Sequence, residues 1–241
     1  MRLVSRFNVF LIFTCVLMLN SSLAHSAFVL DSTRYIYNEK NKSVDVSIKN
    51  NTEKLFGGQV WIESKNESEE SGFVAIPSFF KLEGNKSQLV RVLNVGEGRP
   101  QDRESIYFFN VQEIPTKGDA GNSISFALNT KVKLFYRPAL LEGKREKAEE
   151  KISYKLGSNN QLVFINQSPF YFAIVGLVIN GNEVELKEHD VSKLAQFAPF
   201  SEINVLDNYL NQNKLKNGLE SIKLKSINDF GGVDLYEVQA F

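Results

Sequence analysis

The stretch that decides the fold is "NSISFALNTKVKLFYR", residues 122–137. Its apolar side chains fall on every second position with one interruption, at Ile124, Phe126, Leu128, Val132 and Leu134. A period of two is typical of a β-strand with one apolar face. Such a strand is ordinary core if it lies inside a sheet and an aggregation hazard if it lies on an edge. The two placements predict different kinds of protein.

Similar short runs follow one another along the chain and are separated by polar or glycine-containing turns. They include "KSVDVSIKN" (42–50), "GQVWIES" (58–64), "SQLVRVLNV" (87–95) and "SIYFFNVQEI" (105–114). This spacing predicts an all-β protein built from Greek-key sandwiches. Trp61, on an apolar strand, is predicted to be the core tryptophan of an immunoglobulin-like sandwich, although any buried aromatic position would also suit it.

A charged run, "LEGKREKAEEKI", occupies residues 141–152 and separates two β-rich halves. Charge runs of this kind are often only solvated surface, but this one also marks a change of texture along the chain. We interpret it as a linker between a first domain, residues 27–140, and a second, residues 153–241. Two domains fit the chain length better than one.

The first 26 residues have the pattern of a cleaved secretory signal. Two arginines precede an apolar run over residues 9–19, and Ala24 and Ser26 stand at the −3 and −1 positions of a cleavage site. The run is too short to span a bilayer comfortably. The sequence therefore predicts an exported protein that begins at Ala27 after processing.

The composition restricts the chemistry. The single cysteine, Cys15, lies in the predicted signal, and His189 is the only imidazole that remains after processing. Thiolate or histidine-cluster metal sites are thereby excluded, no cofactor motif is present, and a Ser-His-Asp triad would depend on a histidine in a charged segment. The net formal charge is zero, which gives no reason to expect nucleic-acid binding. We predict a protein that is not an enzyme and holds no metal or cofactor.

Two motifs carry a family resemblance. "PQDRESIYFFNVQEIP" (100–115) and "TKVKLFYRP" (130–138) resemble the signature of the PapD-like periplasmic pilus chaperones. Further motifs occur in the family's order, namely "LDSTRYIY" (30–37), "NQSPFYFAIVGL" (166–177) and "INDFGG" (227–232). The resemblance covers essentially all of residues 27–241.

The resemblance implies a fold and a function. The fold would be two immunoglobulin-like β-sandwich domains in an L or boomerang arrangement. The function would be that of a chaperone in the Gram-negative periplasm, which binds, folds and caps pilus or fimbrial subunits by donor-strand complementation. It would then deliver them to an outer-membrane usher, without a cofactor.

The resemblance also assigns two cations. Arg34 matches the family's cleft arginine and Lys133 its cleft lysine, and together they would anchor the C-terminal carboxylate of a subunit. A guanidinium and an ammonium that converge on one carboxylate make charge-assisted hydrogen bonds. Spacing alone would favour solvated strand-end charges at both positions. Lys131 is expected to be exposed and to have no part in the anchor.

The resemblance assigns the apolar row Ile124, Phe126 and Leu128 to a donor strand, which is lent to a subunit whose own sandwich lacks a strand. Packing into the domain's own core is the alternative that alternation would normally indicate. Strict alternation places Lys133 on the opposite face, unless a bulge intervenes. Self-association through such edges is a further way of hiding the strand.

A third set of residues, Glu104, Arg137 and Asp229, matches an ion network at the family's domain interface. Such a network is weak evidence for stability, but it can fix the angle between domains. One departure from the family pattern is Arg99, which occupies a position that is usually apolar.

Two other function classes compete with this reading. An immunoglobulin-like adhesin or pilus subunit would need a donor extension or an incomplete sandwich, and neither is visible in the sequence. A periplasmic hydrolase or carbohydrate-binding module would need catalytic residues or an aromatic platform. Tyr107, Phe108 and Phe109 are the nearest platform candidates, but their strand pattern favours core positions.

Overall fold

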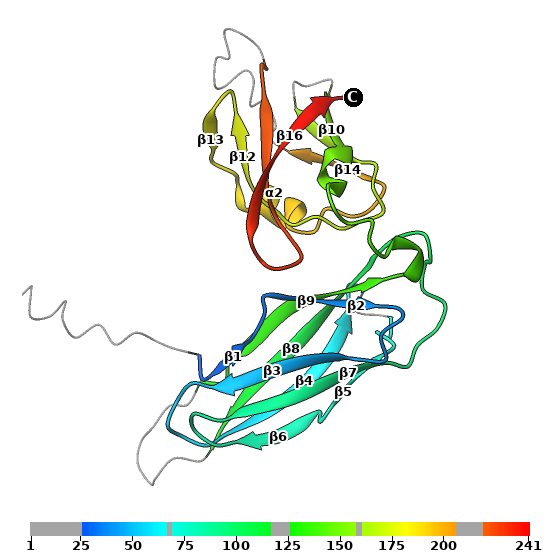
Figure 1. Cartoon of the computed structure of the whole chain (residues 1–241). Coiled ribbons are helices and arrows are strands. Elements are labelled where there is room, and N and C mark those ends of the chain that lie inside the picture. The colour runs from blue at the N-terminus through cyan, green and yellow to red at the C-terminus, as the bar shows by residue number, and fades with distance from the viewer. Residues whose placement is uncertain (1–25, 67–68, 117–125, 158–160, 206–218) are drawn as a thin grey trace, which may run out of the picture.

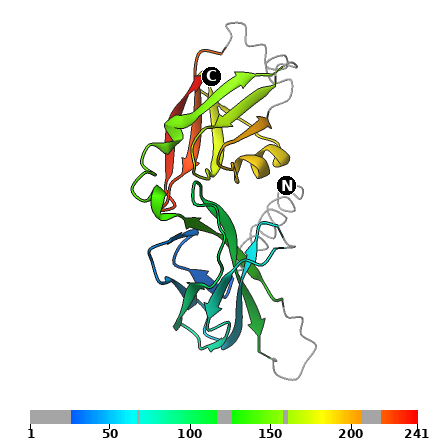
Figure 2. The ribbon, with the colours of Figure 1, turned by 90° about the vertical axis from the view of Figure 1, so that its right-hand side faces the viewer.

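The computed structural model describes residues 26–66, 69–116, 126–157, 161–205 and 219–241. Most of the predicted signal and Ile124 of the predicted donor row lie outside these residues. The described chain is all-β and forms two domains, which Figures 1 and 2 show one above the other at an angle, joined on one side by a short connection. No helix in the described ranges is both long and apolar enough to cross a membrane.

The first domain is a sandwich of two sheets. One has the strand order β1 (Phe28–Leu30), β3 (Val44–Asn50), β7 (Ser87–Asn94) and β5 (Phe73–Ile76). The other has the order β2 (Arg34–Asn38), β9 (Asn129–Arg137), β8 (Ser105–Pro115), β4 (Phe56–Ser64) and β6 (Phe79–Leu82). Neighbouring strands are antiparallel except β2 and β9, which run parallel.

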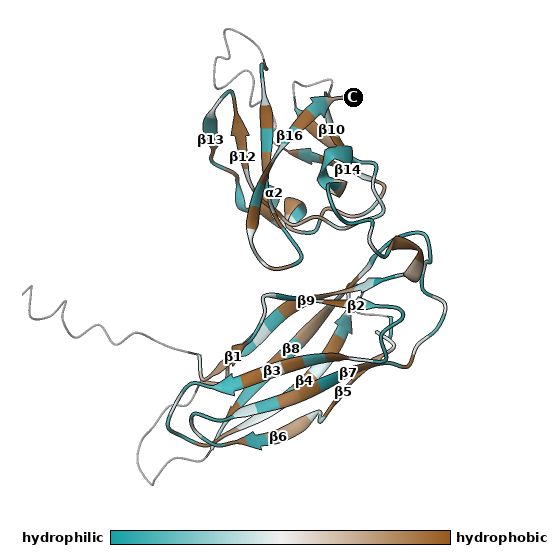
Figure 3. Cartoon of the chain, viewed as in Figure 1, coloured by the Kyte–Doolittle hydropathy of each residue, from teal (hydrophilic) through white to brown (hydrophobic). Residues whose placement is uncertain are grey.

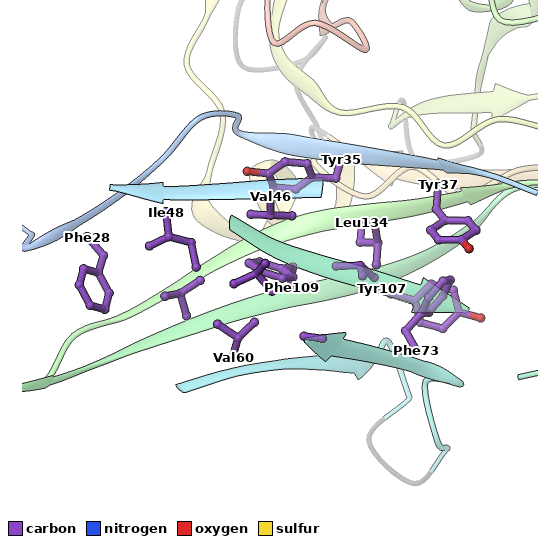
Figure 4. Close-up of a cluster of buried hydrophobic side chains, with 14 of the residues drawn as sticks. Phe28, Tyr35, Tyr37, Val46, Ile48, Val60, Phe73, Tyr107, Phe109 and Leu134 are labelled. Carbon is purple, nitrogen blue, oxygen red and sulfur yellow. The ribbon is translucent and has the colours of Figure 1, made fainter. Parts of the chain in front are cut away.

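Alternation along these strands builds the first core. Apolar and polar residues alternate as brown and teal bands along the strands in Figure 3. The inward side chains meet between the sheets, where Figure 4 shows Tyr35, Val46, Val60, Phe109 and Leu134. Burying each large aliphatic or aromatic side chain contributes about 1.5–3 kcal/mol, so this row is the main source of the domain's stability.

The prediction for Trp61 is wrong. Val60 is buried in the core, whereas Trp61 is only partly buried on the other face of β4, where its indole Nε1 donates to Glu63 Oε1 at 2.7 Å. Successive side chains on a strand point to opposite faces, so only one of the two neighbours can enter the core. Tyr107 and Phe109 are buried as predicted, but Phe108 lies on the outer face of β8.

The second domain is a single curled sheet. Its strand order is β13 (Asn182–Val184), β12 (Ile174–Ile179), β15 (Ile222–Ile227), β16 (Val233–Ala240), β10 (Ile152–Leu156), β11 (Leu162–Asn166) and β14 (Ser201–Val205). A parallel contact between β10 and β16 joins its two halves. The short helix α2 (Glu188–Leu194) buries Leu194 against the core and carries the exposed His189.

The predicted linker is more structured than a free connection. It overlaps two short 3₁₀ helices, η1 (Ala139–Leu141) and η2 (Ala148–Lys151). Leu141 and Ala148 are buried in the second core. The charge run is therefore attached to the second domain through its buried residues, while most of its charged side chains are exposed.

The strand β9 is neither wholly central nor wholly an edge. From Lys133 to Tyr136, β9 pairs with β2 on one side and β8 on the other, so the edge interpretation is wrong for this half. From Asn129 to Val132, among the described strands, it pairs only with β8. The β8–β9 register is regular throughout, which removes the alternative of a bulge.

Candidate functional site: the face between the domains

Arg34 and Lys133 lie side by side on one face of the first domain. The parallel register of β2 and β9 pairs Arg34 with Lys133, and the next residues in each strand, Tyr35 and Leu134, point into the core. Because side chains alternate along a strand, both cations must point away from that core. We call them the anchor pair, and the sheet surface around them the interdomain face.

Both cations contact backbone carbonyls of the second domain. Arg34 Nη1 donates to the carbonyl oxygen of Ile227 at 3.0 Å, and Lys133 Nζ donates to that of Ala195 at 2.5 Å. Arg34 is buried, and its Nε has no hydrogen-bond partner among the described residues. A guanidinium carries five N–H donors and an ammonium three, so the pair retains donors for an additional acceptor.

Burial disfavours the charged forms of both side chains of the anchor pair. Desolvation, with a smaller contribution from the charge of Arg34, lowers the pKa of Lys133 to about 8. Desolvation also lowers the pKa of Arg34, and the charge of Asp229 opposes that shift. Two adjacent cations in a partly dehydrated position favour an anion between them. A carboxylate is therefore the ligand that this geometry would accept best.

The three residues of the predicted ion network are in contact. Arg137 Nε lies 2.7 Å from Glu104 Oε1, and Arg137 Nη1 lies 2.8 Å from Asp229 Oδ2. The backbone N–H of Tyr171 donates to Glu104 Oε2 at 2.9 Å. Burial raises the pKa of Glu104, while the charge of Arg137 opposes that shift. The network joins both domains through a carboxylate that is almost completely buried.

Sequence reasoning missed two members of this network. Arg145, in the charge run, lies 3.6 Å from Asp229 Oδ1 and makes two bonds of 2.7 Å to the buried Glu149. The arginine also stacks on Phe172, with its guanidinium 4.9 Å from the ring centre. The spacing of four residues between Arg145 and Glu149 was the available signal, but that spacing is equally common on solvated surfaces.

The described part of the predicted donor row is exposed. Phe126 and Leu128 precede β9, and 78% and 47% of their surfaces are accessible. They share the parity of Val132 and Leu134, whose side chains face the core, and so continue the inner face of β9 ahead of its first strand residue, Asn129. The backbone N–H of Glu113 still donates to the carbonyl of Leu128 at 2.8 Å, which keeps this end on the sheet.

Two further charged residues behave differently from the anchor pair. Lys131 is exposed as predicted, pairs with Glu63 at 2.7 Å and lies over the Phe108 ring. Arg99, the departure from the family pattern, stacks on Phe73 with 4.3 Å to the ring centre and donates to the Tyr107 hydroxyl at 2.9 Å. Arg99 covers the aromatic end of the first core, and these contacts account for its position without a ligand.

Fold and site together define a class of protein. Two all-β domains hold a pair of cations on the face between them, and an exposed apolar segment precedes the strand that carries Lys133. Among the described residues, no three His, Cys, Asp or Glu side chains lie together as a metal site requires. This combination offers two cations and an unpaired strand edge, the features that a protein binding an extended, anionic polypeptide would need.

Comparison with known proteins gives the family. Residues 27–142 match the N-terminal domain of PapD, described as a pili and flagellar-assembly chaperone, and residues 147–238 match the C-terminal domain of that pili assembly chaperone. The chain belongs to the PapD-like family of pilus chaperones.

The relatives agree in length as well as in sequence. The chain is 42% identical over 222 residues to chaperone protein FanE of Escherichia coli, covering 91% of this chain and 93% of FanE. It is 35% identical over 229 residues to chaperone protein FaeE of Escherichia coli, covering 93% and 83%. The solved SafB chaperone of Salmonella enterica, in complex with SafA pilin, has the same fold, with a TM-score of 0.73 at 21% identity over 90% of this chain and 99% of that one.

Proposed function

We propose that this protein is a periplasmic chaperone that binds, folds and caps fimbrial subunits and passes them to an outer-membrane usher. The observation that carries the proposal is the arrangement on β9, where Lys133 joins Arg34 on the interdomain face and the exposed Phe126 and Leu128 precede the strand. Membership of a pilus-chaperone family supports the subunit as ligand. Binding alone performs this function, so no catalytic residue is required.

The anchor pair would hold the C-terminal carboxylate of the subunit. The carboxylate would accept charge-assisted hydrogen bonds from Arg34 and from Lys133, whose ammonium has donors beyond the one given to Ala195. Because both cations are already placed by neighbouring strands, little conformational entropy is lost when the carboxylate binds. The anchor would thereby set the register of the subunit along β9.

The free edge of β9 would supply the missing strand. Beyond the end of β2, residues 129–132 pair with no other strand among the described residues on the side of β9 opposite β8. A subunit strand pairing there would gain main-chain hydrogen bonds, and its groove would take Phe126 and Leu128. Burying these two side chains would contribute about 3–6 kcal/mol in total before the costs of association. Ile124 would extend the row by one position.

The usher and self-association parts of the proposal rest on different grounds. Delivery to an outer-membrane usher follows from the family resemblance alone. Self-association in the absence of a subunit follows from the same open edge, because an unpaired edge with exposed apolar residues readily pairs with another. Sedimentation of the purified protein with and without a bound subunit tests it, and a monomer at all concentrations would contradict it.

The first test is capture of candidate fimbrial subunits in the periplasm. Phe126→Asp is expected to lower the affinity for a subunit at least about tenfold, because one large apolar side chain contributes about 1.5–3 kcal/mol and 1.4 kcal/mol is a factor of ten. Phe241→Asp is the matched control, since 72% of Phe241 is exposed at the far end of the second domain. Co-purification and titration calorimetry measure the effect; equal losses in the two variants would remove the donor-row assignment.

Binding should also depend on pH through Lys133. Its pKa of about 8 means that the ammonium loses its proton as pH rises above 8, whereas a bound carboxylate favours the protonated form. Affinity should therefore be constant between about pH 5 and 7 and fall above pH 8, by up to about tenfold per pH unit, until the pKa of the complex is reached. Lys133→Arg should flatten this profile because a guanidinium stays charged. An identical profile in both proteins would contradict the assignment.

A further inference from the structure

Glu113 occupies a position where an acid is unexpected. It follows Tyr107, Phe109 and Val111 on the inward face of β8, and only 3% of its surface is accessible. A carboxylate buried at a core-facing position is costly unless other groups satisfy its charge. Among the described residues, its side chain accepts no hydrogen bond from any residue assigned to subunit binding, so the proposed function does not explain it.

The partners of this carboxylate all come from the start of the described chain. Ser26 Oγ donates to Glu113 Oε1 at 2.6 Å, and the backbone N–H of Phe28 donates to the same oxygen at 2.8 Å. Both donors are neutral, and within the described ranges Glu113 forms no ion pair. The residues opposite it on the neighbouring strands, Gly58 and Leu128, carry no charge. Among the described residues, the carboxyl group of Glu113 thus faces two neutral donors and no cation.

The residue between those two donors is Ala27, where the sequence predicts that the mature chain begins. Removal of the signal adds water across the Ser26–Ala27 peptide bond, leaving a carboxylate on Ser26 and an amine on Ala27 that is protonated at neutral pH. The Ser26 hydroxyl departs with the signal. We propose that Glu113 is the binding site for the α-ammonium group of Ala27, which forms on processing and replaces the hydroxyl by an ion pair.

The neighbourhood holds Ala27 in place for this contact. Ala27 and Phe28 are both buried, and the Ala27 carbonyl accepts a hydrogen bond of 2.8 Å from the backbone N–H of Asn51. The Phe28 ring packs against Phe56 and Phe80, with ring centres 6.1 and 5.8 Å away. These contacts do not involve the residues that are cleaved off, so the new ammonium stays next to the carboxylate. Processing would thereby fasten β1 to β8 beside the point where Leu128 joins the sheet.

The titration of the new amine tests the proposal directly. Protein beginning at Ala27, labelled with ¹⁵N, is titrated by NMR and compared with its Glu113→Gln variant. The α-amino pKa should lie about one unit or more above the ordinary 7.7–8.0 in the wild type and return to that range in the variant. Equal values in the two proteins overturn the proposal. If the variant does not fold, an ordinary pKa in the wild type alone overturns it.

A second comparison separates the ion pair from a structural role of Glu113. A form that retains residues 23–26 has no ammonium at Ala27 but keeps the Ser26 hydroxyl. Glu113→Gln should lower the urea midpoint more in the form that begins at Ala27 than in this longer form, whereas equal losses overturn the proposal. Intact mass of the exported protein should show a start at Ala27, and any other start also overturns it. None of these readouts depends on subunit capture, so they stand apart from the proposed function.

Discussion

Lys133→Ala and Arg34→Ala are each expected to abolish the capture of a fimbrial subunit while the protein stays folded. Removing one partner of a desolvated charge pair at an interface costs about 2–5 kcal/mol, which corresponds to a loss of affinity of at least about 30-fold. Both variants should lose affinity, because in each of them a single cation would face the carboxylate. Periplasmic co-purification and calorimetry measure the effect.

Lys131→Ala is the matched control for this experiment. Lys131 lies on the same strand and has the same parity as Lys133, but its ammonium pairs with Glu63 within the first domain. The Lys131→Ala substitution removes one positive charge from the same sheet face and leaves Arg34 and Lys133 unchanged. Capture that is unchanged in both anchor variants, or lowered equally by Lys131→Ala, would contradict the anchor.

Folding of the anchor variants can be anticipated from the contacts that they lose. Lys133→Ala removes one hydrogen bond to the Ala195 carbonyl and relieves the burial of a charge whose pKa is already lowered. Arg34→Ala removes one hydrogen bond to the Ile227 carbonyl and a buried guanidinium nitrogen without a partner among the described residues. Both losses are partly offset by the removed desolvation cost, so circular dichroism and the melting temperature should change little.

The local part of the fold could be predicted from the sequence because it depends on a local pattern. Alternation identified strands of the first domain and put Leu134 and Phe109 on apolar strand faces, which the structure shows to face the core. The pairing partner of a strand is a long-range property, and nothing in residues 122–137 indicates that β2 covers only the second half of β9. The prediction for Trp61 was wrong for a related reason. Alternation shows that neighbouring side chains on a strand face opposite sides, but not which side faces the core.

The site residues also divide into those that the sequence could indicate and those that only the fold brings together. Arg34 and Lys133 are far apart in sequence, and only the resemblance pointed to both before the parallel register brought them together. The carbonyls of Ala195 and Ile227 carry no signal, because every residue has one. Arg145 and Glu149 were hidden in a run of charges whose composition resembles solvated surface, and only the packing of that run distinguishes them.

Arg137→Ala is expected to lower the free energy of unfolding more than removal of any other charged side chain at the interdomain face. It would leave Glu104 buried with an uncompensated negative charge, and breaking one side of a buried ion pair costs about 3–5 kcal/mol. Trp61 is the only tryptophan and lies in the first domain with Glu104, so its fluorescence in urea follows the unfolding of that domain. Lys40→Ala is the control, because Lys40 forms an exposed ion pair with Glu142 that should contribute at most about 1 kcal/mol.

A double variant separates stability from domain orientation. Glu104→Leu combined with Arg137→Met removes both charges, so most of the stability lost in Arg137→Ala should return. The contact from Arg137 to Asp229 would still be missing, and with it a polar link between the domains. Small-angle scattering should therefore show a broader range of domain angles, and subunit affinity should remain low despite restored stability, because the anchor pair depends on carbonyls of the second domain. If subunit affinity recovers together with stability in the double variant, the ion network contributes only to folding. If Arg137→Ala lowers stability no more than Lys40→Ala does, the ion network contributes neither to stability nor to domain orientation.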